Sequence, residues 1–298
     1  MRVAVFGCNG FLGRHLVKFL SEDIGLVDIV LFDKDDKAIN TGFTYEKIDI
    51  SDSEIVKRIN FNYDLIYFFA GLTGTEISIE NTYDYIILNE LGLVNVLDNI
   101  KRFSSYNNKI IFPSTRLVYR GEKNKKLTED SQKEFKTTYA LNKFVCENIL
   151  EIYRLKFNIN YTVFRIGVPY GNEMGLKSSY GTIGFFMDQA KKGMNIKVFG
   201  SGDMRRTFTH VMDICKQLYF GSLISKNEVF NIIGENLSIL EVGILVAKKY
   251  KMEIEFCPFS ERDLVLESGD TIFDYSKIQK ILNDFEIVKF KNWIDTDV

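Results

Sequence analysis

The chain reads VAVFGCNGFLG over residues 3–13, an apolar run followed at once by a glycine-rich turn. Apolar side chains then recur at helical spacing, so the segment predicts a strand, a turn and a helix. Such a turn lets the backbone approach a pyrophosphate at the positive N-terminus of the helix. The spacing is G-x-x-G-x-x-G, not the usual G-x-G-x-x-G, and a plain strand-to-helix turn is the competing interpretation. The predicted dinucleotide-binding residues of the turn are Gly7, Asn9, Gly10, Phe11, Leu12 and Gly13.

The second apolar run, residues 28–32, ends at Asp33, 20 residues after Gly13. An acid at this distance accepts hydrogen bonds from an adenosine ribose and repels a 2′-phosphate, which favours NAD over NADP. The adjacent Lys34 acts against that preference. A third strand is expected to end near Ile48-Asp49-Ile50, where Asp49 either faces the adenine or caps a helix that starts near residues 51–53.

The later pattern continues to alternate between strands and helices. Residues 63–69 are solidly apolar, as in a parallel strand covered on both faces, and they end in Phe69-Ala70-Gly71. A long helical pattern over residues 81–102 precedes strands at 109–112 and 161–166, with a helix between these two strands. The predicted fold is therefore α/β: a doubly wound parallel (Rossmann) sheet over residues 1–167, then a smaller mixed α/β substrate region over 168–298.

Tyr139 and Lys143 lie four residues apart on the predicted helix, and therefore on the same face. A free phenol and a free amine both titrate near pH 10, so neither is a good proton carrier at neutral pH. An ammonium beside the phenol lowers the phenol pKa and makes it a base suited to a hydroxyl proton. Taken alone, a surface helix pair explains the spacing as well. The Ser114-Thr115 hydroxyls, which follow strand 109–112, are expected at the same ligand-binding edge of the sheet.

Composition limits the other possibilities. The chain has 298 residues, of which 46% are hydrophobic, and a formal net charge of -2, so it offers no general attraction to nucleic acid or an anionic membrane. Its four cysteines show neither metal nor disulfide spacing, which predicts no metal and a cytoplasmic location. Neither a signal peptide nor a membrane span is expected from the sequence.

The order of these motifs resembles the extended short-chain dehydrogenase/reductases, specifically their nucleotide-sugar epimerase and dehydratase branch. The resemblance covers nearly the whole chain. The matching residues are Gly7, Gly10, Gly13, Asp33, Asp49-Ile50, Ala70-Gly71, Asn89, Gly92, Ser114-Thr115, Tyr139, Lys143, Arg165, Tyr170-Gly171, residues 198–202, residues 206–213, residues 231–234 and residues 274–277.

This resemblance implies roles for individual residues. Tyr139 is the expected acid and base, with Lys143 on the nicotinamide ribose and Thr115 bonded to the reacting sugar oxygen. Both Tyr139 and Lys143 are also expected to contact the cofactor. Phe199, Arg206 and Arg262 are expected to bind substrate, the two arginines at its diphosphate, because a forked guanidinium suits phosphate. A solvated surface charge is the alternative for each arginine. The resemblance also implies bound NAD, a nucleotide-sugar substrate and a homodimer formed by the helices near 81–102 and 137–157.

Two departures from the family pattern narrow the function. The 4,6-dehydratases carry an Asp-Glu pair after the catalytic Thr, where this chain has Arg116 and Leu117, and Val168 replaces a common substrate-binding Asn. A dehydratase is therefore not expected. The first prediction is an NAD-dependent nucleotide-sugar epimerase that acts at C4. The alternatives are an NAD(P)H-dependent keto-sugar reductase and a non-catalytic dinucleotide sensor, which would not need the phenol.

Overall fold

A computed structural model describes residues 1–26, 28–103, 108–172, 174 and 181–296, with the side chain of Arg262 outside the description. Seven strands of this part form one sheet in the order β11-β7-β5-β4-β1-β2-β3, and every neighbouring pair is parallel. The predicted parallel α/β sheet is confirmed. Its strands are β1 (Val3–Phe6), β2 (Ile29–Asp33), β3 (Thr44–Lys47), β4 (Leu65–Phe68), β5 (Lys109–Thr115), β7 (Asn160–Ile166) and β11 (Glu228–Asn231).

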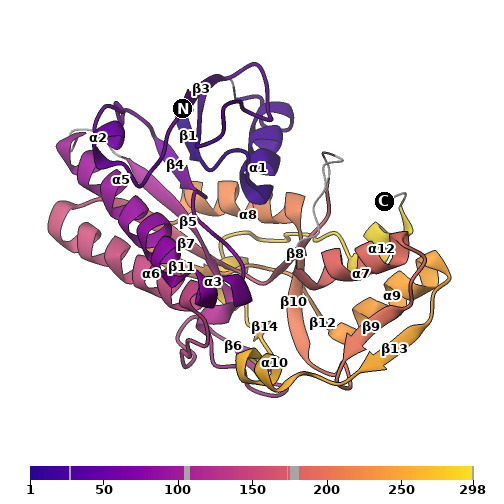
Figure 1. The fold of residues 1–298 in the computed structure, drawn as a ribbon. Helices are drawn as coiled ribbons and strands as arrows, with labels where there is room; N and C mark the ends of the chain where they lie inside the picture. Colours follow the sequence, from indigo (N-terminus) through magenta and orange to yellow (C-terminus); the bar gives the residue numbers. More distant parts are fainter. Residues whose placement is uncertain (27, 104–107, 173, 175–180, 297–298) are drawn as a thin grey trace.

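Helices cover both faces of the sheet. Successive side chains of a strand point to opposite faces, so each strand contributes to both cores. Val3 and Val5 pack with helices α1 (Phe11–Glu22) and α8 (Val211–Ile224). Ala4 and Phe6 pack with α5 (Gly92–Ile100) and α6 (Thr138–Phe157) on the opposite face. Figure 1 shows α5 and α6 side by side on one side of the sheet and α8 against α1 on the other.

The predicted long helical pattern over residues 81–102 is confirmed, but the type of helix changes along it. The chain forms α3 (Glu76–Glu80), α4 (Thr82–Tyr85), a π-helix (Ile86–Leu91), α5 and a 3₁₀ turn (Lys101–Phe103). Asn89 lies inside the π-helical turn, where its side chain accepts from Leu72 N at 2.6 Å and donates to Leu72 O at 3.1 Å. The helix is thus widened where it holds the loop after β4, and such turns are frequent at functional sites.

The third strand ends at Lys47, just before the predicted Ile48-Asp49-Ile50, and Ile48 still donates its N–H to Asp33 O at 2.7 Å. Asp49 does not cap the next helix. Its carboxylate accepts from Ser51 N at 2.9 Å, whereas Asp52 caps α2 (Ser53–Val56) through the N–H groups of Glu54 and Ile55. Asp49 instead lines a cavity beside the glycine turn.

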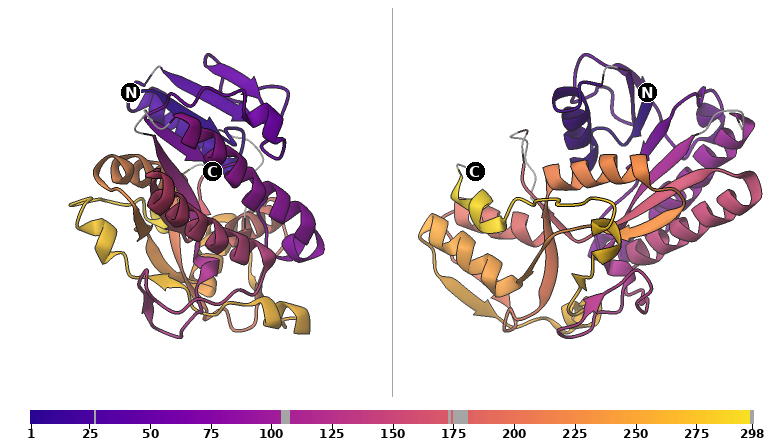
Figure 2. Two further views of the ribbon diagram at one scale, coloured as in Figure 1. Left: turned by 90° about the vertical axis from the view of Figure 1, so that its left-hand side faces the viewer. Right: turned by 180° about the vertical axis from the view of Figure 1, so that it is seen from behind.

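The remaining strands form three small sheets. Two of them surround a separate apolar core that includes Val168, Phe186, Val198 and Phe208, whereas the third, β6 with β14, packs on the core of the large sheet through Leu127 and Phe273. Figure 2 shows these orange and yellow segments gathered on one side of the molecule. The strands are β8 (Val168–Tyr170), β10 (Arg205–His210) and β12 (Glu235–Ser238); β9 (Ile196–Phe199) and β13 (Ile254–Cys257); and β6 (Lys126–Leu127) and β14 (Ile272–Phe273). The helices are α7 (Gly181–Lys191), α9 (Ile239–Tyr250), α10 (Glu261–Leu266), α11 (Ser276–Gln279) and α12 (Phe290–Asp295).

The chain returns to the large sheet after entering this second region. Strand β11 pairs with β7, and Phe230 stacks on Phe164 with ring centroids 5.8 Å apart. Among the described residues, no helix is long and apolar enough to cross a membrane, and no group of three metal-ligating side chains occurs.

Candidate functional site

The glycine turn between β1 and α1 is as tight as its sequence predicts. Gly7 has φ +78°, and a Cβ atom there would lie 2.5 Å from Ala70 N. A Cβ on Gly13 would lie 2.2 Å from Gly7 O. A side chain at either position would therefore push the turn away from the strand ends. This approach leaves the helix N-terminus open to a pyrophosphate.

A cavity lies beside this turn at the carboxyl ends of β1, β2 and β4, where ligands bind in parallel sheets. Its lining contains ten of the predicted cofactor residues: Gly7, Asn9, Gly10, Asp33, Lys34, Asp49, Ile50, Phe69, Ala70 and Gly71. Asp35, Ile48, Leu72 and Leu88 also line the cavity and were not predicted. The predicted Phe11, Leu12 and Gly13 lie in the first turn of α1.

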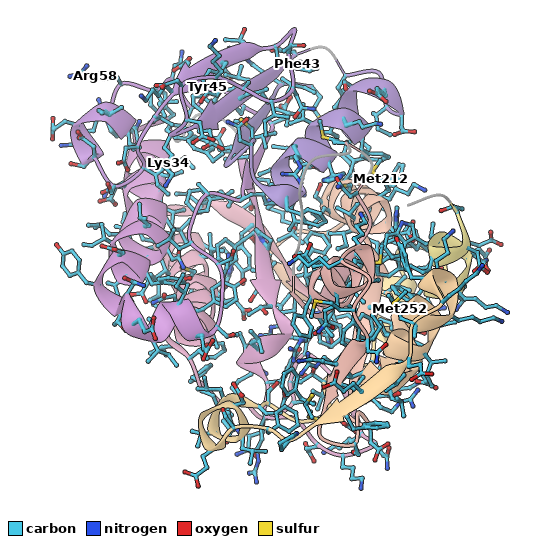
Figure 3. All side chains as sticks on the ribbon, turned by 45° about the vertical axis from the view of Figure 1, so that its right-hand side comes forward. Lys34, Phe43, Tyr45, Arg58, Met212 and Met252 are labelled. Carbon is cyan, nitrogen blue, oxygen red and sulfur yellow. The ribbon has the colours of Figure 1, made fainter. Side chains whose placement is uncertain are left out.

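Two carboxylates, those of Asp33 and Asp35, belong to the lining of the cavity. Asp33 accepts from Asn9 N at 2.9 Å and from Lys34 N at 2.8 Å, while Asp35 accepts from the Asn9 side chain at 3.1 Å. Tyr45, labelled with Lys34 in Figure 3, donates its hydroxyl to the Asp33 and Asp35 carbonyls and so fixes this loop. Two acids facing one lysine suit the hydroxyls of an NAD ribose better than a 2′-phosphate. The lining of this cavity therefore fits NAD.

Helix α6 brings the phenol and the amine to the end of β5. Thr137 caps the helix by accepting from Ala140 N at 3.2 Å, which sets Tyr139 in its first turn. Lys143 Nζ donates to Pro113 O at 2.9 Å and lies 5.9 Å from the centre of the Tyr139 ring. Because Pro113 is two residues before Thr115 on β5, the three predicted catalytic residues belong to one contiguous region.

Lys143 is 8% exposed, and burial lowers its pKa to about 8, although Cys146 and Glu147 act in the opposite direction. The ammonium is thus charged at neutral pH at a cost in stability. It lies 4.5 Å from the centre of the Phe112 ring, a contact that offsets part of this cost. A buried, perturbed amine beside a phenol is typical of a functional site and less so of a surface helix pair.

Lys143→Met should stabilise the cofactor-free protein at neutral pH, because the methionine removes the buried charge. The folded pKa is depressed from 10.5 to about 8, so the cost of the charge is fully present below pH 8 and fades toward 10.5. The stability advantage of the variant should shrink by about 2–3 kcal/mol between pH 7 and pH 10. Urea unfolding at both pH values measures it. Lys57→Met, at an exposed lysine, should show no such trend, and a pH-independent advantage for Lys143→Met would contradict the assignment.

A buried ion pair holds the middle of α6 on the sheet. Arg165 on β7 donates to Glu147 through Nε at 3.0 Å and through Nη2 at 2.6 Å, and both side chains are about 5% exposed. Ser114 Oγ, adjacent to Thr115, donates to the same carboxylate. Glu147 lies one turn after Lys143, so this pair fixes the distance between the helix and the β5 end.

The predicted substrate residues lie in the second region. Arg206 on β10 donates to Glu267 Oε2 at 2.8 Å and to Thr182 Oγ1 at 3.2 Å, and its guanidinium is 11% exposed. The ring of Phe199, at the end of β9, lies 6.2 Å from Phe185. Arg262 lies on α10, and its side chain lies outside the described residues.

Three charged residues near Arg206 were not predicted as site residues. Glu267 pairs with Arg206, Lys136 Nζ donates to Glu267 O at 2.6 Å, and Arg116 lies close enough to Arg206 and Glu267 for their charges to change its pKa. Lys136 and Arg116 could have been suspected because they lie three residues before Tyr139 and one after Thr115. Glu267 carries no such signal, since it follows a short helix far from either motif.

Comparison with known proteins identifies the family of this chain. The model of the NAD dependent epimerase/dehydratase family matches residues 3–232. A Methanocaldococcus jannaschii protein, provisionally named a UDP-glucose 4-epimerase, is 29% identical over 262 residues, which cover 85% of this chain and 83% of that protein. The CDP-paratose 2-epimerase of Salmonella typhi is 27% identical over 324 residues, with 95% and 93% covered.

The fold is likewise similar to a solved structure. The UDP-glucose 4-epimerase of Thermotoga maritima, solved with UDP-glucose, matches with a TM-score of 0.86 at 23% identity and covers 99% of this chain and 97% of that one. The family model spans well over half of the chain, from β1 into the second region. The chain therefore belongs to the NAD-dependent epimerase/dehydratase family of nucleotide-sugar enzymes, within the extended short-chain dehydrogenase/reductases.

Proposed function

We propose that this protein is a nucleotide-sugar epimerase that acts at C4 of the sugar by transient oxidation to a keto sugar. The observation that carries the proposal is the docking of α6 on the β5 end, which gathers Thr115, Tyr139 and the buried Lys143. A dinucleotide sensor has no use for a buried amine held beside a phenol at a cost in stability.

In this proposal Tyr139 accepts the proton of the C4 hydroxyl and later returns it. The Lys143 ammonium stabilises the phenolate, and Thr115 donates a hydrogen bond to the same sugar oxygen. Bound NAD supplies the hydride acceptor and donor. The keto sugar turns within the site between the two transfers, so the product differs in configuration at one carbon.

The two positions after Thr115 support epimerisation over loss of water. Elimination needs an acid and a base beside the sugar, and Arg116 and Leu117 occupy those positions. Arg116 is a permanent cation and Leu117 is apolar, so neither can abstract a proton. Of the three similar proteins described above, two are named 4-epimerases and one is named a 2-epimerase. These names favour C4 as the position of the reaction.

The test follows the hydrogen at C4. Purified protein with NAD is incubated with UDP-glucose and with other nucleotide sugars deuterated at C4, and the products are examined by NMR. We expect a C4 epimer that retains its deuterium, with no net change in nicotinamide absorbance. Consumption of NADH in proportion to product would identify a reductase instead, and deuterium lost to solvent would exclude internal hydride return.

Arg206→Ala should weaken binding of UDP by about 10- to 150-fold, because a partly desolvated guanidinium on phosphate contributes roughly 1.5–3 kcal/mol. Arg206→Lys should recover only part, since an ammonium cannot make the forked contact. Calorimetric titration of each variant measures the effect. NAD affinity should stay nearly constant, as the cofactor cavity lies in the other region.

Arg205 supplies the matched control for this experiment. It precedes Arg206 on β10 and therefore points to the opposite face, where it lies 3.3 Å from Glu241. Arg205→Ala should leave UDP affinity unchanged. If Arg206→Ala binds UDP as tightly as wild type does, Arg206 does not hold the diphosphate. If no nucleoside diphosphate binds the wild type, the nucleotide-sugar function fails.

We also propose a homodimer in a cytoplasmic, reducing environment. Exposed apolar side chains follow α6 at Leu141, Ile152 and Leu155 and continue on the adjacent π-helical segment, with Leu155 68% exposed. Two copies of such a surface could form a four-helix interface. The four cysteines are unpaired, as expected in a reducing compartment. Sedimentation of the purified protein tests the dimer, and a monomer at micromolar concentration would refute it.

A further inference from the structure

Arg116 lies at the junction of the two regions and is held by neutral groups. Its Nη1 donates to Ser268 Oγ at 3.0 Å and to Thr271 Oγ1 at 2.9 Å. Within the described part of the chain, neither its Nε nor its Nη2 donates a hydrogen bond. These two donors form one edge of the guanidinium fork, which matches a carboxylate in geometry.

The charges around Arg116 do not balance. Burial lowers the pKa of Arg116, the positive charge of Arg206 lowers it further, and Glu267 opposes both. The Glu267 carboxylate, however, hydrogen-bonds Arg206. Two guanidiniums therefore share one acid. Arg165 shows the contrast, because its buried guanidinium has a bidentate carboxylate of its own. A partly buried cation with neutral partners indicates a missing anion.

The position of Arg116 says which part of the substrate would carry that anion. Arg116 directly follows Thr115, at the β5 end where the sugar would react, whereas Arg206 belongs to β10 of the second region. We propose that the sugar itself carries a carboxylate and that Arg116 binds it as a specificity-determining residue. This inference rests on the nucleotide-sugar function proposed above, and it names the class of sugar as a uronic acid or a similar acidic sugar.

The experiment compares matched ligands on the NAD-loaded protein by equilibrium competition. UDP-glucuronate and UDP-glucose differ only in the carboxylate, and UDP lacks the sugar. We expect wild type to bind UDP-glucuronate about 10- to 100-fold more tightly than UDP-glucose, the scale of one charge-assisted contact. Arg116→Gln should abolish this ratio and leave UDP affinity unchanged, while Arg116→Lys should retain part of it.

Two controls separate this result from a loss of folding or of nucleotide binding. Arg120→Gln removes an exposed arginine four residues further on, bonded to Gln132, and should preserve the ratio. Glucuronate 1-phosphate and glucose 1-phosphate repeat the comparison without any base. They decide the inference even if no nucleoside diphosphate binds, an outcome that would count against the proposed function alone.

Three results would overturn the inference. Equal affinity of wild type for the acidic and neutral members of both ligand pairs would show that no carboxylate is recognised. An equal loss of affinity for UDP, UDP-glucose and UDP-glucuronate in Arg116→Gln would place Arg116 on the diphosphate instead. A ratio that survives in Arg116→Gln would assign the recognition to another residue, which also refutes the proposal.

Discussion

Tyr139→Phe is expected to lower turnover by a factor of about 100 or more, the usual scale for a lost general acid–base group. Phenylalanine keeps the ring that packs near the Lys143 ammonium, 5.9 Å from its centre, and removes only the hydroxyl. Helix α6 should therefore stay in place. NAD affinity should change little, since Tyr139 does not line the cavity beside the glycine turn.

Initial rates at saturating substrate and an NAD titration measure the two effects. Tyr153→Phe is a suitable control, because Tyr153 lies on the same helix and donates to Asp98 at 2.6 Å, three turns and more beyond Tyr139. It should turn over at a rate close to that of wild type. Turnover within a few-fold of wild type in Tyr139→Phe would remove this phenol from the mechanism.

The strands and the glycine turn could be predicted because their signals are local. Short apolar runs that end in Gly7, Asp33 and Gly71 give both the parallel strands and the edge at which they end. Family membership and NAD dependence, predicted from the order of these motifs, are confirmed. The roles of Thr115, Tyr139, Lys143 and Arg206 stay predictions.

What could not be predicted depends on contacts between distant segments. The π-helical turn lies where the Asn89 side chain bonds to Leu72, and this contact between separate segments leaves no periodic signal. Strand β11 joins the sheet through its register with β7, although it follows a long excursion into the second region. The periodicity of a helix or strand shows which of its side chains are buried, but it does not show which other element they pack against.

The same reasoning applies to the charges of the site. Arg206 was predicted to bind the substrate diphosphate, and the structure adds that Glu267 pairs with it from a segment whose sequence gives no indication of that contact. From the sequence, Arg116 indicated only that the acid found in the 4,6-dehydratases is absent. Its proposed role in binding a carboxylate follows from its hydrogen bonds to Ser268 and Thr271, which are distant in sequence. The position of a charged residue in a motif can be read from the sequence, but the residue that pairs with it can be identified only from the folded structure.

Glu147→Leu should destabilise the protein by about 3–5 kcal/mol, because it leaves the Arg165 guanidinium buried without a counter-charge. Both side chains are about 5% exposed, and the two contacts of 3.0 and 2.6 Å form a bidentate pair. The Ser114 hydroxyl would also lose its acceptor. Urea unfolding of the cofactor-free protein measures the change.

The double variant Glu147→Leu with Arg165→Met tests the cause. Removing both charges should cost clearly less than the sum of the single substitutions, since no unpaired ion remains. Glu151→Gln is the matched control on the same helix: its pair with Arg154 is 2.7 Å long but 32–40% exposed, so we expect a loss of about 1 kcal/mol or less. Additive losses in the double variant would mean that packing and not charge pairing holds α6 against β7. If the charge pair is what sets α6 on the sheet, the double variant should regain stability but keep a lowered turnover, because Lys143 and Ser114 would lose the group that aligns them.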